Sequence, residues 1–291
     1  MKIAFGMIVF EGDYVLKECL EQVYPFANQI LISEGPVLYW QKQGKTTSTD
    51  DTNKILNNFP DPENKIKIIH GQFNEKDDQC KAYMDFIDED TDYIWNLDSD
   101  EIYKNEDILK IIDFLKKEKP TSVGIQSCSF YGGFDYYLTG FELKQDNFLR
   151  IFKYIKGSNW LTHRPPTIKY PKNIIKKHIN SNLLYNLIGV QMYHYSYVFP
   201  DQVFKKINYY KNSVSKQNCI DNYFQEIYLP WVLNENKYEI EKKYLGVHEF
   251  KPHIRGECYT EKFYGEHPKS IINNLNNLTE KFNNQLKKYI L

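Results

Sequence analysis

The sequence has few cysteines and no long hydrophobic run. The five cysteines form no Cys-x-x-Cys pair and lie far apart, at Cys19, Cys80, Cys128, Cys219 and Cys258. This spacing argues against a disulfide framework and against a zinc cluster, and it favours a reducing compartment. No segment approaches the ~20 apolar residues that a membrane-spanning helix needs, and no small-residue cleavage site follows the apolar run at 2–10. We therefore expect a cytoplasmic protein with no integral membrane segment.

An excess of charge of either sign is also lacking. Lysine and arginine number 37 against 38 aspartate and glutamate, which leaves a formal net charge of -1. Such a chain has no overall field to attract nucleic acid, so we expect no nucleic-acid partner. Arginine occurs only as Arg150, Arg164 and Arg255. In a chain that uses lysine almost everywhere, arginine is expected where its planar, two-pronged guanidinium is needed, either in a salt bridge or against a phosphate or an acidic ligand.

The first half of the chain alternates short apolar runs with helical patterns. Strands are predicted at 2–10, 29–35, 65–70 and 92–97, and amphipathic helices are predicted at 13–26, 49–59, 77–87 and 105–118. The last of these helices is expected to turn Ile108, Leu109, Ile111, Ile112 and Leu115 inward. Alternation of this kind predicts an α/β fold with a mostly parallel sheet flanked by helices, whose ligands bind beyond the carboxyl ends of the strands.

The second half is mixed. Aromatic-rich strands are predicted within 122–133, 147–154 and 190–199, followed by a helix at 201–216 and a polar helical tail. We predict one α/β domain over 1–216 and a helical extension over 217–291 packed on it. Apolar residues recur at helical spacing in the tail, which favours docking on the domain or homodimerisation over membrane contact.

Three carboxylates follow the fourth predicted strand in the stretch YIWNLDSDEIY (93–103). Side chains two apart on an extended segment point the same way, so Asp98 and Asp100 can face one ion. Hard oxygen donors on an exposed turn suit Mg²⁺ or Mn²⁺ and, through the cation, a diphosphate. The alternative is an acidic turn that caps the following helix. The preceding apolar strand and the βα alternation favour the metal site.

The order of these blocks resembles the GT-A glycosyltransferases, specifically the GT2-type bacterial enzymes and their branch similar to lipopolysaccharide-core β-1,4-glucosyltransferases. The matching blocks are FEGDYVLKECLEQV (10–23), LISEG (31–35), TSTDDT (47–52), DYIWNLDSDEIY (92–103), NFLRIFK (147–153) and YHYSYVFPDQVFKKINYY (193–210). The resemblance implies a Rossmann-like GT-A sheet and transfer of a sugar from a nucleoside-diphosphate donor, with a UDP-sugar favoured. The implied acceptor is a hydroxyl of a glycan or lipid-linked glycan, and the implied stereochemistry is inverting.

The resemblance also implies roles for single residues. Asp98 and Asp100 would hold the divalent cation that stabilises the departing nucleotide, and His194 would complete the cation or phosphate site. His194 has the alternative of a packed histidine among tyrosines, and as a ligand it shifts the preference from Mg²⁺ toward Mn²⁺. The implied contacts with the nucleotide come from Glu11, Glu34, Asp50, Gln79 and Lys81. For the three acids the alternative is a surface acid or a helix cap, and the extra segment 36–46 puts Asp50 in question.

An inverting transfer needs a carboxylate base. Relatives commonly carry His-Glu before the late histidine, but this chain has His163-Arg164, so the most obvious base is missing. Asp146, just before NFLRIF, is the nearest remaining acid and the first candidate for the base. Asp135 and Glu142 are weaker candidates. Arg164 and Arg150 are then suited either to the diphosphate or to a structural salt bridge.

Two other functions compete with this interpretation. A nucleotidyltransferase that makes sugar nucleotides would share the βα alternation and a metal-binding carboxylate, but it would usually carry a glycine-rich basic loop after the first strand, where this chain has FEGD. A non-catalytic carbohydrate-binding protein would explain the aromatic residues but not the acidic pair at the end of a strand.

Overall fold

The computed structural model describes residues 1–140, 148–213, 219–249 and 257–290. It consists of two compact units, Met1–Gln126 with Asp146–Met192 and Ser127–Gln145 with Tyr193–Leu291. We call them unit 1 and unit 2 and describe each by itself. The predicted division of the chain at residue 216, into a domain and an extension, differs from the division into these two units and stays a prediction.

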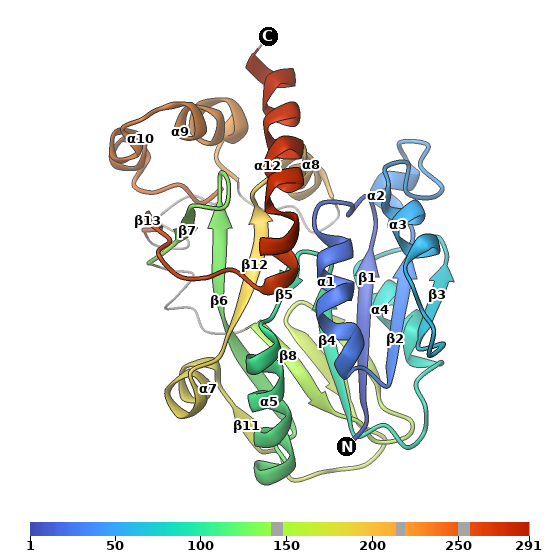
Figure 1. Ribbon diagram of the computed structural model, residues 1–291. Coiled ribbons are helices and arrows are strands. Elements are labelled where there is room, and N and C mark those ends of the chain that lie inside the picture. Colours follow the sequence, from blue (N-terminus) through green and yellow to red (C-terminus); the bar gives the residue numbers. More distant parts are fainter. Residues whose placement is uncertain (141–147, 214–218, 250–256, 291) are drawn as a thin grey trace. The chain divides into compact units, whose positions relative to one another are not determined.

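Unit 1 is built on a mostly parallel sheet with strand order β3-β2-β1-β4-β8-β6 (Figure 1). The four predicted N-terminal strands form with small changes at their ends, and β1 lies between β2 and β4, both parallel to it. The strands are β1 (Ile3–Val9), β2 (Gln29–Glu34), β3 (Ile66–His70), β4 (Tyr93–Asp98), β5 (Glu101–Ile102), β6 (Ser122–Tyr131), β8 (Phe148–Lys153), β9 (Asn159–His163), β10 (Pro166–Lys169) and β11 (His178–Ile179). Strand β8 runs antiparallel to β4 and β6. The α/β, GT-A-like architecture predicted from the sequence is confirmed.

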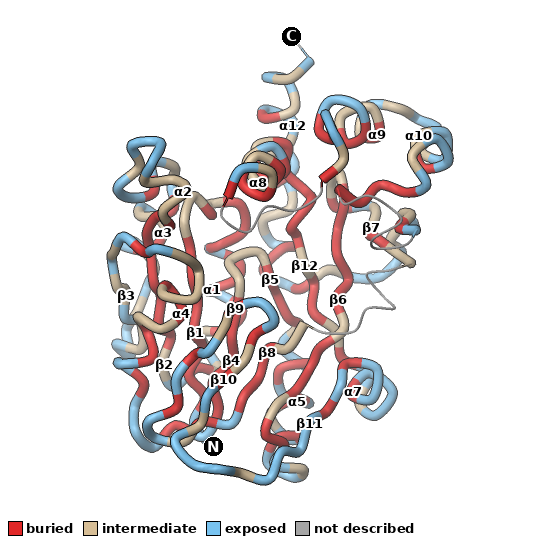
Figure 2. Tube along the Cα trace, turned by 180° about the vertical axis from the view of Figure 1, so that it is seen from behind, coloured by how far each residue is buried: buried red, intermediate tan, exposed pale blue. Residues whose placement is uncertain are grey.

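Helices cover both faces of this sheet. In the view of Figure 1, α1 and α5 lie in front of the sheet and α4 lies behind it. The helical segments of unit 1 are α1 (Leu16–Val23), η1 (Tyr24–Phe26), α2 (Leu38–Gln41), α3 (Thr52–Asn58), α4 (Lys76–Met84), α5 (Asn105–Glu118) and α7 (Ser181–Ile188). Figure 2 shows the central strands as buried, as expected for a parallel sheet covered on both sides.

The core on the α4 side joins the sheet to the β9–β10 hairpin. Ala4 and Ile8 of β1 pack in one cluster with Cys80 and Tyr83 of α4 and with Trp160 of β9. These two β1 residues point to one face because strand side chains alternate.

Helix α5 departs in part from its predicted core face. Ile108, Ile111 and Leu115 are buried as predicted, but Leu109 is 52% exposed and Phe114 is buried instead. The apolar residues of this helix cover a wider arc of its surface than the face that is buried. The periodicity of the sequence therefore did not show which apolar residues lie at the exposed edge of that face.

Unit 2 combines short strands with helices. Its elements are β7 (Tyr136–Leu138), β12 (Gln191–Tyr197, which starts in unit 1), α8 (Pro200–Asn212), η2 (Phe224–Tyr228), α9 (Leu229–Leu233), α10 (Lys237–Tyr244), β13 (Thr260–Lys262) and α12 (Lys269–Ile290). An aromatic cluster forms its core, with Tyr131 and Trp231 edge-to-face at 4.9 Å between ring centroids. Helix α12 docks on α8, where Asp201 accepts hydrogen bonds from Lys288 (2.7 Å) and Tyr289 (2.8 Å). Helix α12 is thus anchored to α8 within unit 2, while the predicted packing of a 217–291 extension on a 1–216 domain and homodimerisation both stay predictions.

Candidate active site

The segment 45–52 contacts the carboxyl ends of β1 and β2, and Glu34 connects the end of β2 to the end of β3. Glu34, at the end of β2, is 1% exposed and accepts a hydrogen bond from the Ser48 backbone N–H at 2.9 Å. Its other carboxylate oxygen lies 3.0 Å from His70 Nδ1 at the end of β3. Glu11, just after β1, accepts hydrogen bonds from the Thr49 N–H at 3.0 Å and from Lys45 Nζ at 3.0 Å. Two of the three predicted nucleoside-binding acids therefore contact one short segment.

Asp50 lies beside them despite the extra segment at 36–46. Its carboxylate accepts a hydrogen bond from the Thr52 N–H at 3.0 Å, at the start of α3, and one from the Asp13 N–H at 3.4 Å. Part of the extra segment folds into α2, and Gln41 of that helix donates hydrogen bonds to the carbonyl groups of Pro36 and Phe73. The insertion therefore does not separate Asp50 from Glu11. The N-cap residue of α3 is Asp51, which makes no side-chain cap hydrogen bond. Asp50 lies one residue before it and accepts from the first N–H of the helix.

The pKa of Glu34 reflects these contacts. Burial of the Glu34 carboxyl raises its pKa, but hydrogen bonds from Ser48 and from His70 outweigh burial and leave the pKa below its ordinary value. A lowered pKa in the folded state means that the Glu34 contacts stabilise the fold fully above the ordinary value of about 4.3, and that this stabilisation is lost as the pH falls through the folded-state pKa.

We predict that Glu34→Gln lowers the free energy of unfolding at pH 7 by about 1.5–3 kcal/mol, the usual contribution of a hydrogen bond to a charged group. The difference between the wild type and the variant should shrink as the pH is lowered below about 4, because the wild-type carboxylate then becomes protonated. Urea unfolding of both proteins between pH 3 and pH 7 measures this effect. A difference that stays constant over that range would contradict the prediction.

Gly35, which follows Glu34, is required by a close backbone contact. Its φ is +146°, and a Cβ at this position would lie 1.9 Å from the carbonyl oxygen of Gly71. We expect Gly35→Ala to lower the free energy of unfolding by at least about 1–3 kcal/mol, the usual cost of backbone strain. Gly44→Ala is the matched control, since Gly44 also has a positive φ but open space around its Cβ position. Equal losses of stability in the two variants would refute the role of the contact with Gly71.

Gln79 and Lys81 have different surroundings on α4. Gln79 is 3% exposed, and its amide donates to the carbonyl groups of Val9 (3.2 Å) and Ser33 (2.9 Å) at the ends of β1 and β2. The Lys81 side chain is partly exposed to solvent, and its Nζ lies 3.5 Å from Asp78 Oδ1. The amide group of Gln79 therefore holds two strand ends together, which the sequence did not indicate.

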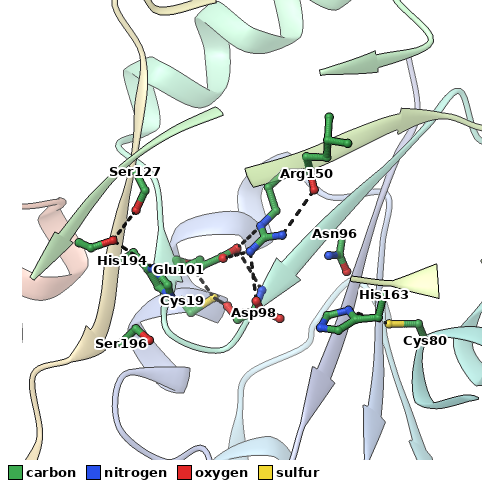
Figure 3. A network of polar contacts seen from close by, with 12 residues as sticks. Cys19, Cys80, Asn96, Asp98, Glu101, Ser127, Arg150, His163, His194 and Ser196 are labelled. Atoms are coloured by element: carbon green, nitrogen blue, oxygen red, sulfur yellow. Dashed lines mark hydrogen bonds and ion pairs between the residues drawn. The ribbon is translucent and has the colours of Figure 1, made fainter. Parts of the chain in front are cut away.

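The acidic turn after β4 contains a buried ion pair. Arg150 of β8 donates from Nε to Glu101 Oε2 at 2.8 Å and from Nη2 to Asp98 Oδ2 at 3.1 Å, and Nη2 also contacts Glu101 Oε1 (Figure 3). The exposed fractions of the side chains are 5% for Arg150, 0% for Glu101 and 31% for Asp98. Of the two roles predicted for Arg150, the structure shows the salt bridge. The third carboxylate of the DSDE stretch, Glu101, was noted in the sequence without a role.

A buried histidine lies in the same region. His163 Nδ1 is 3.5 Å from Cys80 Sγ, and the His163 N–H donates to Asp77 Oδ1 at 2.5 Å. Burial lowers the pKa of His163 to about 3, although the negative charge of Asp98 acts in the opposite direction. The imidazole is therefore neutral at physiological pH. The neighbouring Arg164 lies exposed in the turn between β9 and β10.

The structure does not test the roles predicted for three further residues. Asp146, the predicted base, lies outside the described residues, as does Glu142. His194 belongs to unit 2, on β12, and its Nδ1 lies 3.4 Å from Ser129 Oγ. A shared metal site of His194 with Asp98 and Asp100 therefore stays a prediction.

The turn after β4 suits a cation that is coordinated partly by the oxygen atoms of a bound diphosphate. Within the described part of the chain, no cluster of three or more His, Cys, Asp or Glu side chains is arranged to hold a metal ion. Mg²⁺ is usually bound by one or two protein carboxylates together with phosphate oxygens and water. The strand ends at Asp98, and Ser99 and Asp100 form a turn, so the two aspartates do not lie on one extended segment as predicted. Both side chains are partly exposed, and their carboxylate oxygens are of the kind that this type of site uses, in which the diphosphate supplies part of the coordination.

All five cysteines are buried, and none of them forms a disulfide bond in the structure. The described helices include none with both the length and the apolar character needed to cross a membrane.

Comparisons with known proteins show what this chain is similar to. No protein of curated function matches the chain. Two structures of Staphylococcus aureus TarS 1-349 resemble it. One has 12% identity and a TM-score of 0.38, with 53% of this chain and 47% of that chain covered. The other, a complex with UDP-GlcNAc, has 15% identity and a TM-score of 0.35, with 45% and 36% covered. This chain thus spans less than half of the TarS chains.

A third similar structure is 4-diphosphocytidyl-2C-methyl-D-erythritol synthase from Anaerococcus prevotii, with 13% identity and a TM-score of 0.31, covering 58% of this chain and 68% of that chain. These likenesses are too weak to assign a ligand. The family model "Glycosyl transferase family 2" matches residues 46–184, a stretch that includes Asp50, Asp98, Asp100 and Arg150. Residues 46–184 of this chain are therefore similar to a glycosyl transferase family 2 domain.

Proposed function

We propose that the protein is a divalent-cation-dependent glycosyltransferase that moves a sugar from a nucleoside-diphosphate sugar, with a UDP-sugar favoured, to a hydroxyl of a glycan or glycoconjugate acceptor. The observation that carries the proposal is the position of Asp98 and Asp100. Asp98 is the last residue of β4 and Asp100 lies in the turn after it, at the edge of the sheet where the ends of β1 and β2 also lie, within the family 2 segment. Ligands of open parallel sheets bind at this edge.

Each part of the site has a role in the proposal. Asp98 and Asp100 hold the cation on the diphosphate, and when bound the cation neutralises charge on the departing nucleotide. Mn²⁺ is favoured over Mg²⁺ if His194 also contributes. Glu11 and Asp50 present carboxylate oxygens that accept hydrogen bonds from ribose hydroxyls or from the uracil N–H.

Inversion at the sugar, with Asp146 as the base that receives the acceptor proton, also belongs to the proposal. It is supported by the resemblance to the inverting branch. A cytoplasmic location is supported by five cysteines that form no disulfide bond.

The experiment is to incubate the protein with Mn²⁺ and a panel of nucleotide sugars and to measure free nucleoside diphosphate, with and without EDTA. Release that depends on the cation and on one sugar nucleotide supports the proposal. A nucleotidyltransferase would instead release pyrophosphate from a nucleoside triphosphate and a sugar phosphate. A carbohydrate-binding protein would release neither product, and that result would refute a transferase.

A further inference from the structure

The Arg150 side chain lies between two carboxylates of very different exposure. It makes a two-pronged contact with Glu101, through Nε and Nη2, and a single contact with Asp98 through Nη2 (Figure 3). Glu101 is fully buried, whereas Asp98 is 31% exposed. Two-pronged arginine–carboxylate pairs are the stronger kind, with defined geometry. The guanidinium is therefore primarily the partner of Glu101.

Glu101 also holds the main chain of Asp98. Glu101 Oε2 accepts a hydrogen bond from the Asp98 N–H at 3.2 Å. The carbonyl oxygen of Glu101 in turn accepts a hydrogen bond from Cys19 Sγ at 3.2 Å, which anchors this turn to α1. Asp98 is thus held at its backbone by Glu101 and at one carboxylate oxygen by Arg150.

The charges of the three side chains Arg150, Glu101 and Asp98 do not cancel among themselves. The single positive charge of Arg150 faces two carboxylates, Glu101 and Asp98, and one negative charge remains. Because Glu101 is buried and doubly bonded to the guanidinium, that charge remains on Asp98, at the exposed side. Without Glu101 the guanidinium would act as the counter-ion of Asp98 itself and would repel a second cation by Coulomb's law.

We infer that Glu101 and Arg150 are positioning residues for the cation–diphosphate site: Glu101 neutralises Arg150 so that Asp98 keeps its negative charge for the cation, and Arg150 fixes the orientation of the Asp98 carboxylate. This inference rests on the proposed function, since it assumes that Asp98 binds the cation. In this arrangement Arg150 can hold the Asp98 carboxylate in one orientation without weakening its attraction for the cation, because Glu101 neutralises the charge of Arg150.

The test measures binding of Mn²⁺ directly, by the electron paramagnetic resonance signal of free Mn²⁺ titrated with protein in the presence of UDP. Glu101→Gln keeps the side-chain shape but leaves the charge of Arg150 unbalanced beside Asp98. We expect Mn²⁺ binding to weaken about 10–100-fold, the usual effect of changing a residue that supports a metal ligand. Asp107→Asn is the matched control, because Asp107 is also a buried acid, 6% exposed, on α5. It should bind Mn²⁺ as the wild type does.

The double variant Glu101→Gln/Arg150→Met separates charge from orientation. It removes one charge of each sign, so Mn²⁺ binding should return to within a few-fold of the wild type, while sugar transfer stays low because the Asp98 carboxylate is no longer fixed. A purely structural role would lower the unfolding temperature of both variants and leave Mn²⁺ binding unchanged. If Glu101→Gln does not fold, as judged by circular dichroism, the double variant decides. Binding more than tenfold weaker than that of the wild type then contradicts the inference.

The outcomes also separate this inference from the proposed function. Wild-type protein that binds Mn²⁺ with UDP, an Asp98→Asn variant that does not, and a Glu101→Gln variant that binds normally would overturn the inference alone. Equal binding by the wild type and Asp98→Asn, or no binding by either, would overturn the metal site and the inference with it.

Discussion

Asp98→Asn should lower the rate of sugar transfer about 10²–10³-fold, the size of effect seen when one group that stabilises transition-state charge is removed. The substitution keeps the shape of the side chain and an oxygen that can accept the hydrogen bond from Arg150, so the fold should persist. The loss should arise because an amide oxygen binds a hard divalent cation more weakly than a carboxylate does. Steady-state release of nucleoside diphosphate at saturating Mn²⁺ measures the effect, and Asp100→Asn should act in the same direction.

A matched control for this experiment is Asp78→Asn. Asp78 is an exposed acid on α4 that pairs with Lys81 at the surface, and such pairs contribute little to stability. Transfer by the control should equal that of the wild type. Full activity of Asp98→Asn or Asp100→Asn, with circular dichroism spectra like that of the wild type, would rule out the metal-site assignment.

Arg150→Met should lower the free energy of unfolding by about 3–5 kcal/mol, the usual cost of leaving one partner of a buried ion pair without its counter-ion. Glu101, at 0% exposure, would then carry a buried charge without the guanidinium that balances it. Unfolding in urea at pH 7 measures the loss. Because marginal stability is typical of folded proteins, a large part of the variant is expected to be unfolded at moderate temperature.

The double variant Arg150→Met/Glu101→Gln serves as the control for stability as well. It should regain a substantial part of the lost free energy, because a buried neutral amide costs less than a buried charge. If Arg150→Met alone costs less than about 1 kcal/mol, the ion pair is not a major contributor to the fold. The coupling of the two substitutions, rather than either alone, gives the contribution of the pair.

The arrangement of unit 1 could be predicted because its sequence is locally consistent. Each of the four N-terminal strands is a short apolar run, and each helix between them has one apolar face and a proline or polar stretch at its end, so period and length agree on the same elements. The order of the elements then implies parallel strands. Because of this consistency, the sequence alone places Asp98 at the end of a buried strand, and β4 ends at that residue.

The detailed contacts of the site could not be predicted in the same way. The pairing of Glu101 with Arg150 joins residues that are 49 positions apart, and no local pattern states which buried acid meets which cation. The rarity of arginine drew attention to Arg150 but left its partner open. Likewise, the contact of Gln79 with the ends of β1 and β2 depends on how α4 packs, which periodicity does not describe.

The insertion at 36–46 shows a similar limit. Its length alone suggested that Asp50 is displaced from the position it has in relatives. In the structure part of the insertion forms α2, and the returning segment brings Lys45 to Glu11 and Ser48 to Glu34. Sequence length therefore did not predict distance in space, because a loop of this size can return to its starting point at little entropic cost.

The buried state of the cysteines has a practical consequence for studying binding. Burial raises the pKa of Cys19, Cys80, Cys128 and Cys219, and a thiol with a raised pKa reacts slowly with alkylating reagents. A cysteine placed at the exposed position of Lys42, at the end of α2, would thus be labelled selectively. A fluorophore there, close in sequence to the Lys45–Glu11 contact, would turn the arrival of a nucleotide into an optical signal without removal of the native thiols.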